Sequence, residues 1–271
     1  MTFRPPSALT IAGSDSGGGA GVAADLKTFE AHGVWGSLAV TAVTAQNTLG
    51  VHAAETLSPE LVRVQIGAVA SDIGVDAAKT GMLGTAEVVE AVADAVRDFG
   101  VRPLVVDPVM VSTAGSRLLG PDAIDVLRQR LLPLAAVVTP NLAEAAVLAG
   151  REIGDRDSMA DAALALADLG SGVVLVTGGH LDDWAGTAAD CLLVQGGRPE
   201  WMEAPRVDTP HTHGSGCVLS AAICAELARG MEPADACVAA KHFVTSAIGA
   251  ALALGAGPGA VDPGWERRAR G

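Results

Sequence analysis

The sequence predicts one α/β domain with a mostly parallel central sheet and helices on both of its faces. Short apolar segments rich in Val, Ile and Ala alternate with longer segments of helical periodicity along most of the 271 residues. Helical connections between strands form right-handed crossovers, which make neighbouring strands parallel. No stretch has the composition of a linker, so residues 1–271 are expected to form a single domain.

The strands are predicted from apolar segments of three to ten residues, most of which end in a polar residue or a glycine. Two segments joined by Gly196-Gly197 are expected to form an antiparallel hairpin at one edge. The predicted strands are Ala8–Ala12, Trp35–Thr44, Ala77–Thr80, Leu104–Val106, Ala135–Val138, Val173–Thr177, Ala188–Gln195 and Pro199–Ala204.

The helices are predicted from their ends and their apolar stripes. Ser58 precedes Pro59 as an N-cap precedes a first helical proline, and Thr85 caps a helix with a valine stripe. Ser158 to Asp161 has the spacing of a capping box, and Gly33 and Gly170 each end a helix. The other predicted helices are Ala23–His32, Pro121–Leu131, Leu142–Ala149, Gly216–Ala228 and Pro233–Leu254.

The charge and cysteine content exclude several classes of protein. Eighteen Lys and Arg against 31 Asp and Glu give a net charge of −13 without any basic run, so neither nucleic acid nor a membrane is an expected partner. No signal peptide is predicted, and the longest uncharged apolar run, 243–261, is interrupted by glycines and a proline. Four cysteines without paired spacing indicate free thiols and a cytoplasmic protein.

The first candidate binding segment is the glycine-rich loop Gly13–Gly21, between a strand and a helix. Ligands of open α/β sheets bind at the carboxyl ends of the strands, and glycines let a ligand approach the backbone. Gly19–Ala24 matches GxGxxA, but no acidic residue follows at the distance that ribose binding requires. A Walker A loop is also absent from the sequence. A nicotinamide site is therefore the weakest of the hypotheses.

Two further pairs of polar residues follow predicted strands. Gln46 and Asn47 offer amides that can hydrogen-bond the edge of a heteroaromatic ring, although Asn47 can equally stabilise a turn. Asn141 and Glu144 are three residues apart at the start of a helix. Such a pair could face a cation or its water shell, and helix capping is the alternative.

The most informative segment is His211–Ala222. Gly214, Ser215 and Gly216 precede a long helix, whose first N–H groups would form an anion hole. Cys217 falls in the first turn, where the helix dipole is expected to lower the thiol pKa and favour the thiolate. The other cysteines (Cys191, Cys224 and Cys237) are expected in the core, and His211 and His213 are expected to cap loops.

The whole chain resembles the hydroxymethylpyrimidine/phosphomethylpyrimidine kinases of thiamine biosynthesis, within the ribokinase-like superfamily. The resemblance rests on the segments ALTIAGSDSGGGAG, ADLKTFEAHG, AVTAQNTLGV, KTGML, VVDPVM, TPNLAEA, GGHLDD, HTHGSGCVLSAAI and GPGAV. It implies a three-layer α/β/α sandwich, a homodimer, and a small-molecule substrate. The implied reaction is ATP- and Mg²⁺-dependent phosphorylation of 4-amino-5-hydroxymethyl-2-methylpyrimidine, and then of its monophosphate.

The resemblance also implies roles for individual residues. Cys217 stands where most ribokinase-like enzymes have an aspartate base, and it would act beside the anion hole of Gly214, Ser215 and Gly216. Gln46 would read the amino group and a nitrogen of the pyrimidine. The implied pyrimidine pocket consists of Gly13, Ala20, Asp25, Gln46, Met82 and Val109. The implied nucleotide site consists of Asp107, Asn141, Glu144, Thr177 and Gly179, with Glu144 toward the metal.

The sequence departs from the family pattern at a few positions. Thr177 replaces a frequent lysine, His211 replaces a frequent asparagine, and Ser16-Gly17 replaces a frequent Pro-Ser, which is interpreted as a loop variant without effect on the chemistry. A vitamin B6 kinase is the nearest alternative, and Gln46 argues against it. A non-catalytic nucleotide- or vitamin-binding protein is a further alternative, which would not need Cys217, Asn141 and Glu144 together.

Overall fold

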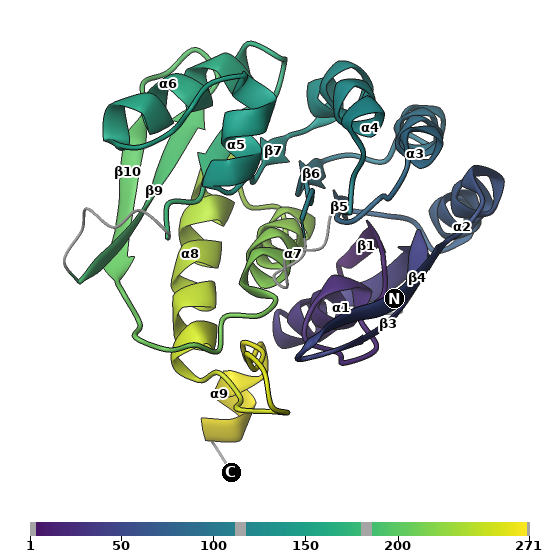
Figure 1. The fold of residues 1–271 in the computed structure, drawn as a ribbon. Coiled ribbons are helices and arrows are strands. Elements are labelled where there is room, and N and C mark those ends of the chain that lie inside the picture. Colours follow the sequence, from purple (N-terminus) through teal and green to yellow (C-terminus); the bar gives the residue numbers. More distant parts are fainter. Residues whose placement is uncertain (1–3, 112–117, 180–185, 270–271) are drawn as a thin grey trace.

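The central sheet of the protein has eight strands, in the order β10-β9-β8-β7-β6-β5-β1-β2 (Figure 1). The computed structural model describes residues 4–111, 118–179 and 186–269. Strands β8 to β2 pair in parallel, and β9 and β10 are antiparallel at one edge, as predicted. Their bounds are β1 Ser7–Ala12, β2 Trp35–Val40, β5 Ala77–Thr80, β6 Leu104–Val106, β7 Val137–Val138, β8 Val173–Val176, β9 Thr187–Val194 and β10 Glu200–Pro205.

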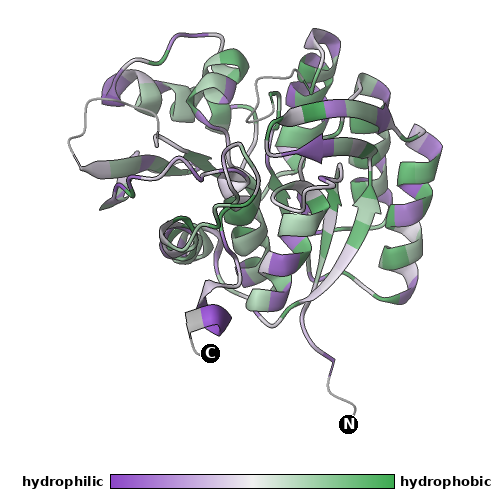
Figure 2. Cartoon of the chain, turned by 60° about the horizontal axis from the view of Figure 1, so that its bottom comes forward, coloured by the Kyte–Doolittle hydropathy of each residue, from purple (hydrophilic) through white to green (hydrophobic). Residues whose placement is uncertain are grey.

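Helices cover both faces of the sheet, which confirms the three-layer prediction (Figure 1). Alternate residues of a strand point to opposite faces, so Val105 packs into one core and Val106 into the other. Figure 2 shows hydrophobic residues on the helix sides that face the sheet. One face carries α2 Pro59–Asp72, α3 Ala86–Asp98, α4 Pro121–Val126, α5 Leu142–Ala149 and α6 Arg156–Ala167. The other carries α1 Gly21–Ala31, α7 Ser215–Ala228 and α8 Pro233–Gly249, with α9 Trp265–Ala269 after them.

The segment predicted as one strand, Trp35–Thr44, is two strands in different sheets. The chain leaves the central sheet at Thr41 and continues as β3 Ala42–Asn47, which pairs with β4 Gly50–Thr56 in a separate antiparallel hairpin. The β4 strand was missed because its residues are mostly exposed and lack an apolar alternation. The register of the hairpin shifts between Ala45 and Gln46, as at a β-bulge.

Three predicted helices have an end that differs from the structure by three or more residues. The N-cap of α6 is Asp155, whose carboxylate accepts from the Ser158 N–H at 2.8 Å while Ser158 bonds back to Asp155. The capping box therefore begins three residues before Ser158. The helix predicted over Pro121–Leu131 becomes a π-helix after Val126, and α8 ends at Gly249 rather than Leu254. None of the helices in the described ranges is long and apolar enough to cross a bilayer.

Candidate active site

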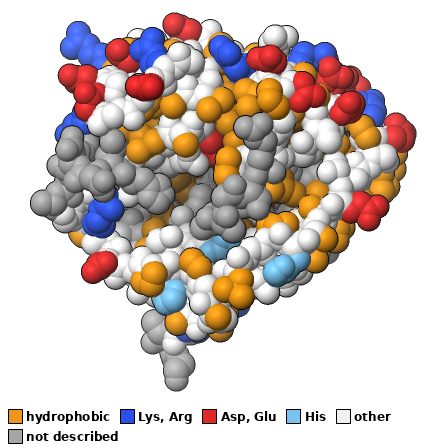
Figure 3. Space-filling model, in the orientation of Figure 1, with side chains coloured by type: hydrophobic (Ala, Val, Ile, Leu, Met, Phe, Trp, Pro, Cys, Tyr) orange, Lys and Arg blue, Asp and Glu red, His pale blue; other side chains and the backbone are white. Residues whose placement is uncertain are grey.

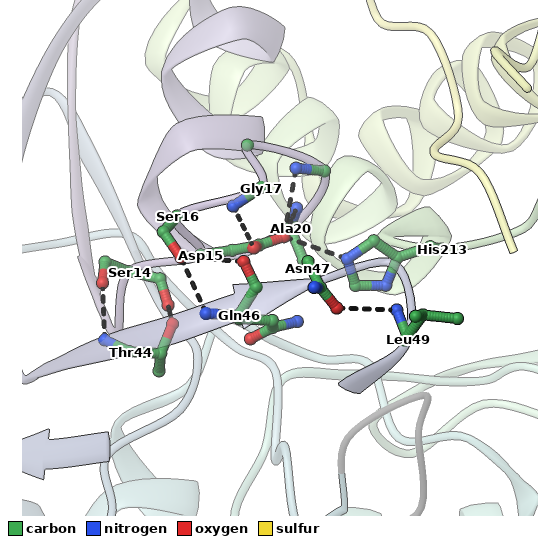
Figure 4. A network of polar contacts seen from close by, with 12 residues as sticks. Ser14, Asp15, Ser16, Gly17, Ala20, Thr44, Gln46, Asn47, Leu49 and His213 are labelled. Carbon is green, nitrogen blue, oxygen red and sulfur yellow. Dashed lines mark hydrogen bonds and ion pairs between the residues drawn. The ribbon is translucent and has the colours of Figure 1, made fainter. Parts of the chain in front are cut away.

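The glycine-rich loop after β1 is organised by the carboxylate of Asp15. Its oxygens accept the backbone N–H groups of Gly17 at 2.8 Å, Gly19 at 3.0 Å and Ala20 at 2.9 Å. The ring of His213 adds a fourth contact, at 2.9 Å (Figure 4). Although burial opposes ionisation, these contacts hold the pKa of Asp15 below its usual range. The loop is thereby fixed ahead of α1, with Ala20 as the residue that precedes the helix.

Two serines of this loop fasten the β3–β4 hairpin, and with it Gln46. Ser14 bonds to Thr44 through both its hydroxyl and its carbonyl, at 3.0 and 2.9 Å. The Ser16 hydroxyl accepts from the Gln46 N–H at 2.7 Å and lies 2.8 Å from the Gln46 carbonyl (Figure 4). Ser16, interpreted from the sequence as an inert variant, therefore positions the backbone of the expected pyrimidine reader. The Asn47 side chain accepts the Leu49 N–H at 2.9 Å, which is the turn role.

Gly13, Met82 and Val109 lie at the ends of β1, β5 and β6. A Cβ atom on Gly13 would overlap the end of the Met82 side chain, so these two residues are in direct contact. The Met82 carbonyl accepts the Thr41 hydroxyl at 2.6 Å, which ties it to the start of the hairpin. Met82 and Val109 are half-buried and offer apolar surface. The structure therefore brings the glycine loop, the hairpin and these apolar residues together at the carboxyl ends of the parallel strands.

Beneath the loops lies a buried charge cluster, which we define as Asp25, Lys79 and Asp107. The Lys79 ammonium is 3.2 Å from both oxygens of Asp25 and 3.9 Å from Asp107. Thr10 donates to Asp25 at 2.6 Å and Ser220 donates to Asp107 at 2.9 Å. Asp25 has no exposed surface and forms an ion pair with Lys79, and the direct substrate contact implied by the resemblance stays a prediction.

The electrostatics of this cluster are those of two carboxylates sharing one ammonium. Burial raises the pKa of both Asp25 and Asp107, and the charge of Lys79 offsets part of that effect. Burial alone would lower the pKa of Lys79, but the surrounding acidic groups raise it above its ordinary value. The role of Lys79 was not predicted from the sequence. The available signal was a lysine within a strand of otherwise small or apolar residues, in a chain with only three lysines.

Asn141 and Glu144 form a reciprocal capping box at the start of α5. The Glu144 N–H donates to Asn141 at 3.0 Å, and the Asn141 N–H donates to Glu144 at 3.0 Å. The other Glu144 oxygen accepts the Met110 N–H at 3.3 Å. The capping alternative is therefore confirmed. Burial and the nearby charge of Asp107 raise the pKa of Glu144 to about 8.

Thr177 and Gly179 follow the carboxyl end of β8, on the same side of the sheet as the glycine loop. Thr177 forms a bridge with Asn141, and its N–H donates to the Pro140 carbonyl at 2.9 Å. Gly178 donates to Asp190 at 3.0 Å, and Lys241 of α8 donates to the same carboxylate at 2.7 Å. This second ion pair holds the strand end that leads to the exposed Gly179. The remainder of the GGHLDD segment, 180–183, lies outside the described residues.

The α7 helix begins directly against the glycine loop. Gly214 is its N-cap, with φ of +82° and no side chain to cap the helix. The Ser215 N–H donates to the Thr212 carbonyl at 3.2 Å, so an anion would be bound by the other N–H groups at this helix start. A Cβ atom on Gly214 would collide with the Gly19 carbonyl, which shows that the two backbones touch. Cys217 lies in the first turn and is partly buried against the core beneath α7.

The Cys217 thiol does not have the lowered pKa that its position in the helix suggests. Burial raises its pKa to about 12, and the charges of Asp25 and Asp107 add to this while Lys79 and the Gly21 N–H oppose it. The expected thiolate is therefore corrected to a neutral thiol at pH 7. The dipole argument missed first the burial of the thiol and then the two carboxylates of the buried charge cluster, neither of which the linear sequence shows.

Gly214 offers a test of the contact between the two loops. We expect Gly214→Ala to reduce the free energy of unfolding by at least about 1–2 kcal/mol, because its φ is left-handed and its new Cβ meets the Gly19 carbonyl. Gly216→Ala is the matched control, since a Cβ built there meets no atom of the described residues within 4 Å outside its own helix turn. Urea unfolding of both variants makes the measurement, and equal stability for the two would contradict the contact.

On the face of the molecule drawn in Figure 3, charged side chains are more frequent at the periphery than at the centre. In Figure 3, charged side chains gather at the rim over α3, α4 and α6, and hydrophobic and histidine side chains lie nearer the centre of this face. Among the described residues, no cluster of three or more His, Cys, Asp or Glu side chains could hold a metal ion by itself.

Comparison with known proteins relates the chain to small-molecule kinases. The family model described as phosphomethylpyrimidine kinase matches residues 15–262. A hydroxymethylpyrimidine/phosphomethylpyrimidine kinase of Streptomyces coelicolor is 50% identical, over 96% of this chain and 95% of that protein. An ADP complex of Bacillus subtilis pyridoxal kinase is 41% identical with a TM-score of 0.90, covering 97% of this chain and 99% of that one. A phosphomethylpyrimidine kinase structure from Clostridium difficile is 40% identical with a TM-score of 0.78, covering 89% and 99%.

Proposed function

The chain belongs to the phosphomethylpyrimidine kinase family, and from this premise we propose that it phosphorylates 4-amino-5-hydroxymethyl-2-methylpyrimidine with ATP and then converts the monophosphate to the diphosphate. These two steps would serve thiamine biosynthesis. The observation that carries the proposal is the contact between the loop that positions Gln46 and the loop that positions Cys217. This contact supports a reaction in which Gln46 would bind the pyrimidine and the start of α7 would bind the transferred phosphate.

The chemistry needs positioning and charge neutralisation more than covalent catalysis. The N–H groups at the start of α7 would stabilise the charge of the transferred phosphoryl group. Cys217 would accept the proton of the hydroxymethyl group in its thiolate form, which is the minor form at pH 7, and becomes the neutral thiol as it does so. Proton transfer that comes late in a loose transition state lessens the demand on this base. In the second step the nucleophile is an ionised phosphate, so the base matters less.

The residues present fit a magnesium ion that is held mainly by nucleotide phosphates. Mg²⁺ commonly keeps several waters and takes only one or two carboxylates from the protein. Asp107 and Glu144 are close enough for their charges to repel, which contributes to the raised pKa of Glu144, and a cation would relieve that repulsion. The ion would neutralise phosphate charge when bound. Because Glu144 already caps α5, we propose that its contact is to the water shell of the ion.

A pyridoxal kinase is the second candidate, favoured by the 0.90 TM-score with a protein of that name. The deciding experiment measures ATP consumption with hydroxymethylpyrimidine, its monophosphate and pyridoxal, and identifies the products by mass spectrometry. Mono- and diphosphates of the pyrimidine support the first proposal. Pyridoxal phosphate as the sole product would replace it with the second.

Gln46 is expected to decide between these two substrates. We expect Gln46→Leu to raise the KM for hydroxymethylpyrimidine by about ten- to a hundredfold, because an amide that pairs with the ring edge contributes about 1–3 kcal/mol when its partner is buried. Pyridoxal lacks the amino group, so its KM should change by less than about threefold. Steady-state kinetics on both acceptors makes the comparison. Equal changes in the two KM values would refute the role of Gln46.

We also propose that the protein is a cytoplasmic homodimer. Large apolar side chains are exposed on β2 and the hairpin, among them Trp35 at 58% and Val43 at 52%. Contiguous exposed apolar surface is typical of an interface. The free cysteines suit a reducing compartment. Sedimentation equilibrium tests the dimer, with an expected mass twice the 27.1 kDa of the chain.

A further inference from the structure

We infer that His213 is a positioning residue, which through Asp15 sets the anion hole of α7 against the loop that holds the pyrimidine. This inference rests on the proposed function for its kinetic part only. We call the contact between His213 Nε2 and Asp15 Oδ2, at 2.9 Å, the Asp15–His213 clasp (Figure 4). Both side chains are largely buried, at 13% and 3% exposure, so water competes little for the contact.

The clasp joins two segments that are 198 residues apart in the chain. On one side, Asp15 holds the N–H groups of Gly17, Gly19 and Ala20, which shape the glycine loop. On the other side, His213 directly precedes Gly214, the N-cap of α7. A small displacement of His213 would therefore move the start of the anion hole relative to the glycine loop.

His213 is also bonded through its backbone to the C-terminal segment. Its N–H donates to the Gly259 carbonyl at 3.2 Å, and its carbonyl accepts the Val261 N–H at 3.1 Å. The neighbouring His211 ring accepts the Gly259 N–H at 2.8 Å. These bonds fix the backbone of His213, which keeps its side chain within hydrogen-bond distance of Asp15.

The C-terminal segment also contacts the β3–β4 hairpin, which carries Gln46, so the loops form a closed ring of contacts. Gly257 donates to the Thr48 hydroxyl at 3.1 Å, which ties the C-terminal segment to the turn of the β3–β4 hairpin. The hairpin carries Gln46, whose backbone bonds to Ser16, the neighbour of Asp15. The clasp therefore adds a contact between two buried side chains to this ring, and it links the loop next to Gln46 with the start of α7.

The test compares wild type with His213→Ala, His213→Gln and Asp15→Asn. A displacement of about 1 Å in a catalytic arrangement costs on the order of a hundredfold in rate. We expect His213→Ala to lower kcat by about ten- to a hundredfold with less than about a threefold change in the KM for ATP. His213→Gln should recover most of kcat, because its Nε2 can still donate to Asp15. His242→Ala, an exposed histidine on α8, is the control and should match wild type.

Two kinetic results would overturn the inference: a folded His213→Ala enzyme with kcat within about twofold of wild type, or a His213→Gln enzyme as slow as His213→Ala. Amide hydrogen exchange of the unliganded protein tests the clasp without any turnover. His213→Ala should speed exchange in peptides covering both 13–21 and 211–217, and His213→Gln should not. Unchanged exchange in either peptide also overturns it. If wild type phosphorylates no acceptor, the proposed function fails while exchange still decides the clasp.

Discussion

Lys79→Met is expected to destabilise the protein by about 3–5 kcal/mol, the cost of leaving a buried charge without its partner. The ammonium is fully buried and is the cation shared by Asp25 and Asp107. Urea unfolding measures the loss. Lys27→Met is the matched control, because Lys27 is exposed and bonds to a loop carbonyl, and it should change stability by less than about 1 kcal/mol.

The loss in Lys79→Met should depend on pH in a defined direction. Without the ammonium, the folded-state pKa of each buried aspartate rises further above its unfolded value. Stability from such a group is present below the unfolded pKa and is lost as pH rises through the folded pKa. The variant should therefore be closer to wild type at pH 5 than at pH 8. Lys79→Met combined with Asp25→Asn should recover part of the loss, and a pH-independent loss without recovery would contradict the cluster.

Cys217→Ala is expected to slow phosphorylation of the hydroxymethyl group by about a hundredfold or more, the usual contribution of a general base. Phosphorylation of the monophosphate should fall by less than about tenfold, because its nucleophile is already ionised. Single-turnover assays on the two acceptors give both numbers with one variant, so the second step is the internal control. Equal losses would indicate that Cys217 supports the site only by packing.

A pH profile of the wild-type enzyme tests the same role of Cys217. With a thiol pKa of about 12, the thiolate fraction grows about tenfold per pH unit through neutral pH. The first phosphorylation should therefore quicken between pH 7 and 9, and the second should not share that rise. A first step that is flat over this range would remove the thiolate from the mechanism.

Most of the fold could be predicted because its signals are local. The predicted bounds of β5, β6 and α5 agree with the structure, and Thr85 caps α3 as its spacing indicates. The split at Thr41 could not be predicted, because an apolar segment continues through it while the chain changes sheets. The π-helix after Val126 likewise departs from a pattern that suits an α-helix.

The candidate site was predictable in its residues and not in their contacts. Motifs identify Gln46, Asn141 and Cys217, but the spacing of Asn141 and Glu144 does not decide between capping and a cation. The ionisation of Cys217 depends on its burial and on the charges of Lys79, Asp25 and Asp107, all of which arise only through the fold. Lys79 and the Asp15–His213 clasp were missed for the same reason, because each joins segments distant in sequence.

The buried charge cluster also bears on how such a sequence can diverge. A lineage that replaces Lys79, or only one of its partners, must pass through an unbalanced charge in the core. Random drift at positions 25, 79 and 107 should therefore be correlated rather than independent. Descendants that have lost the lysine are expected to have lost at least one of the two aspartates as well. Pairwise covariation of these three positions among related sequences would show this correlation.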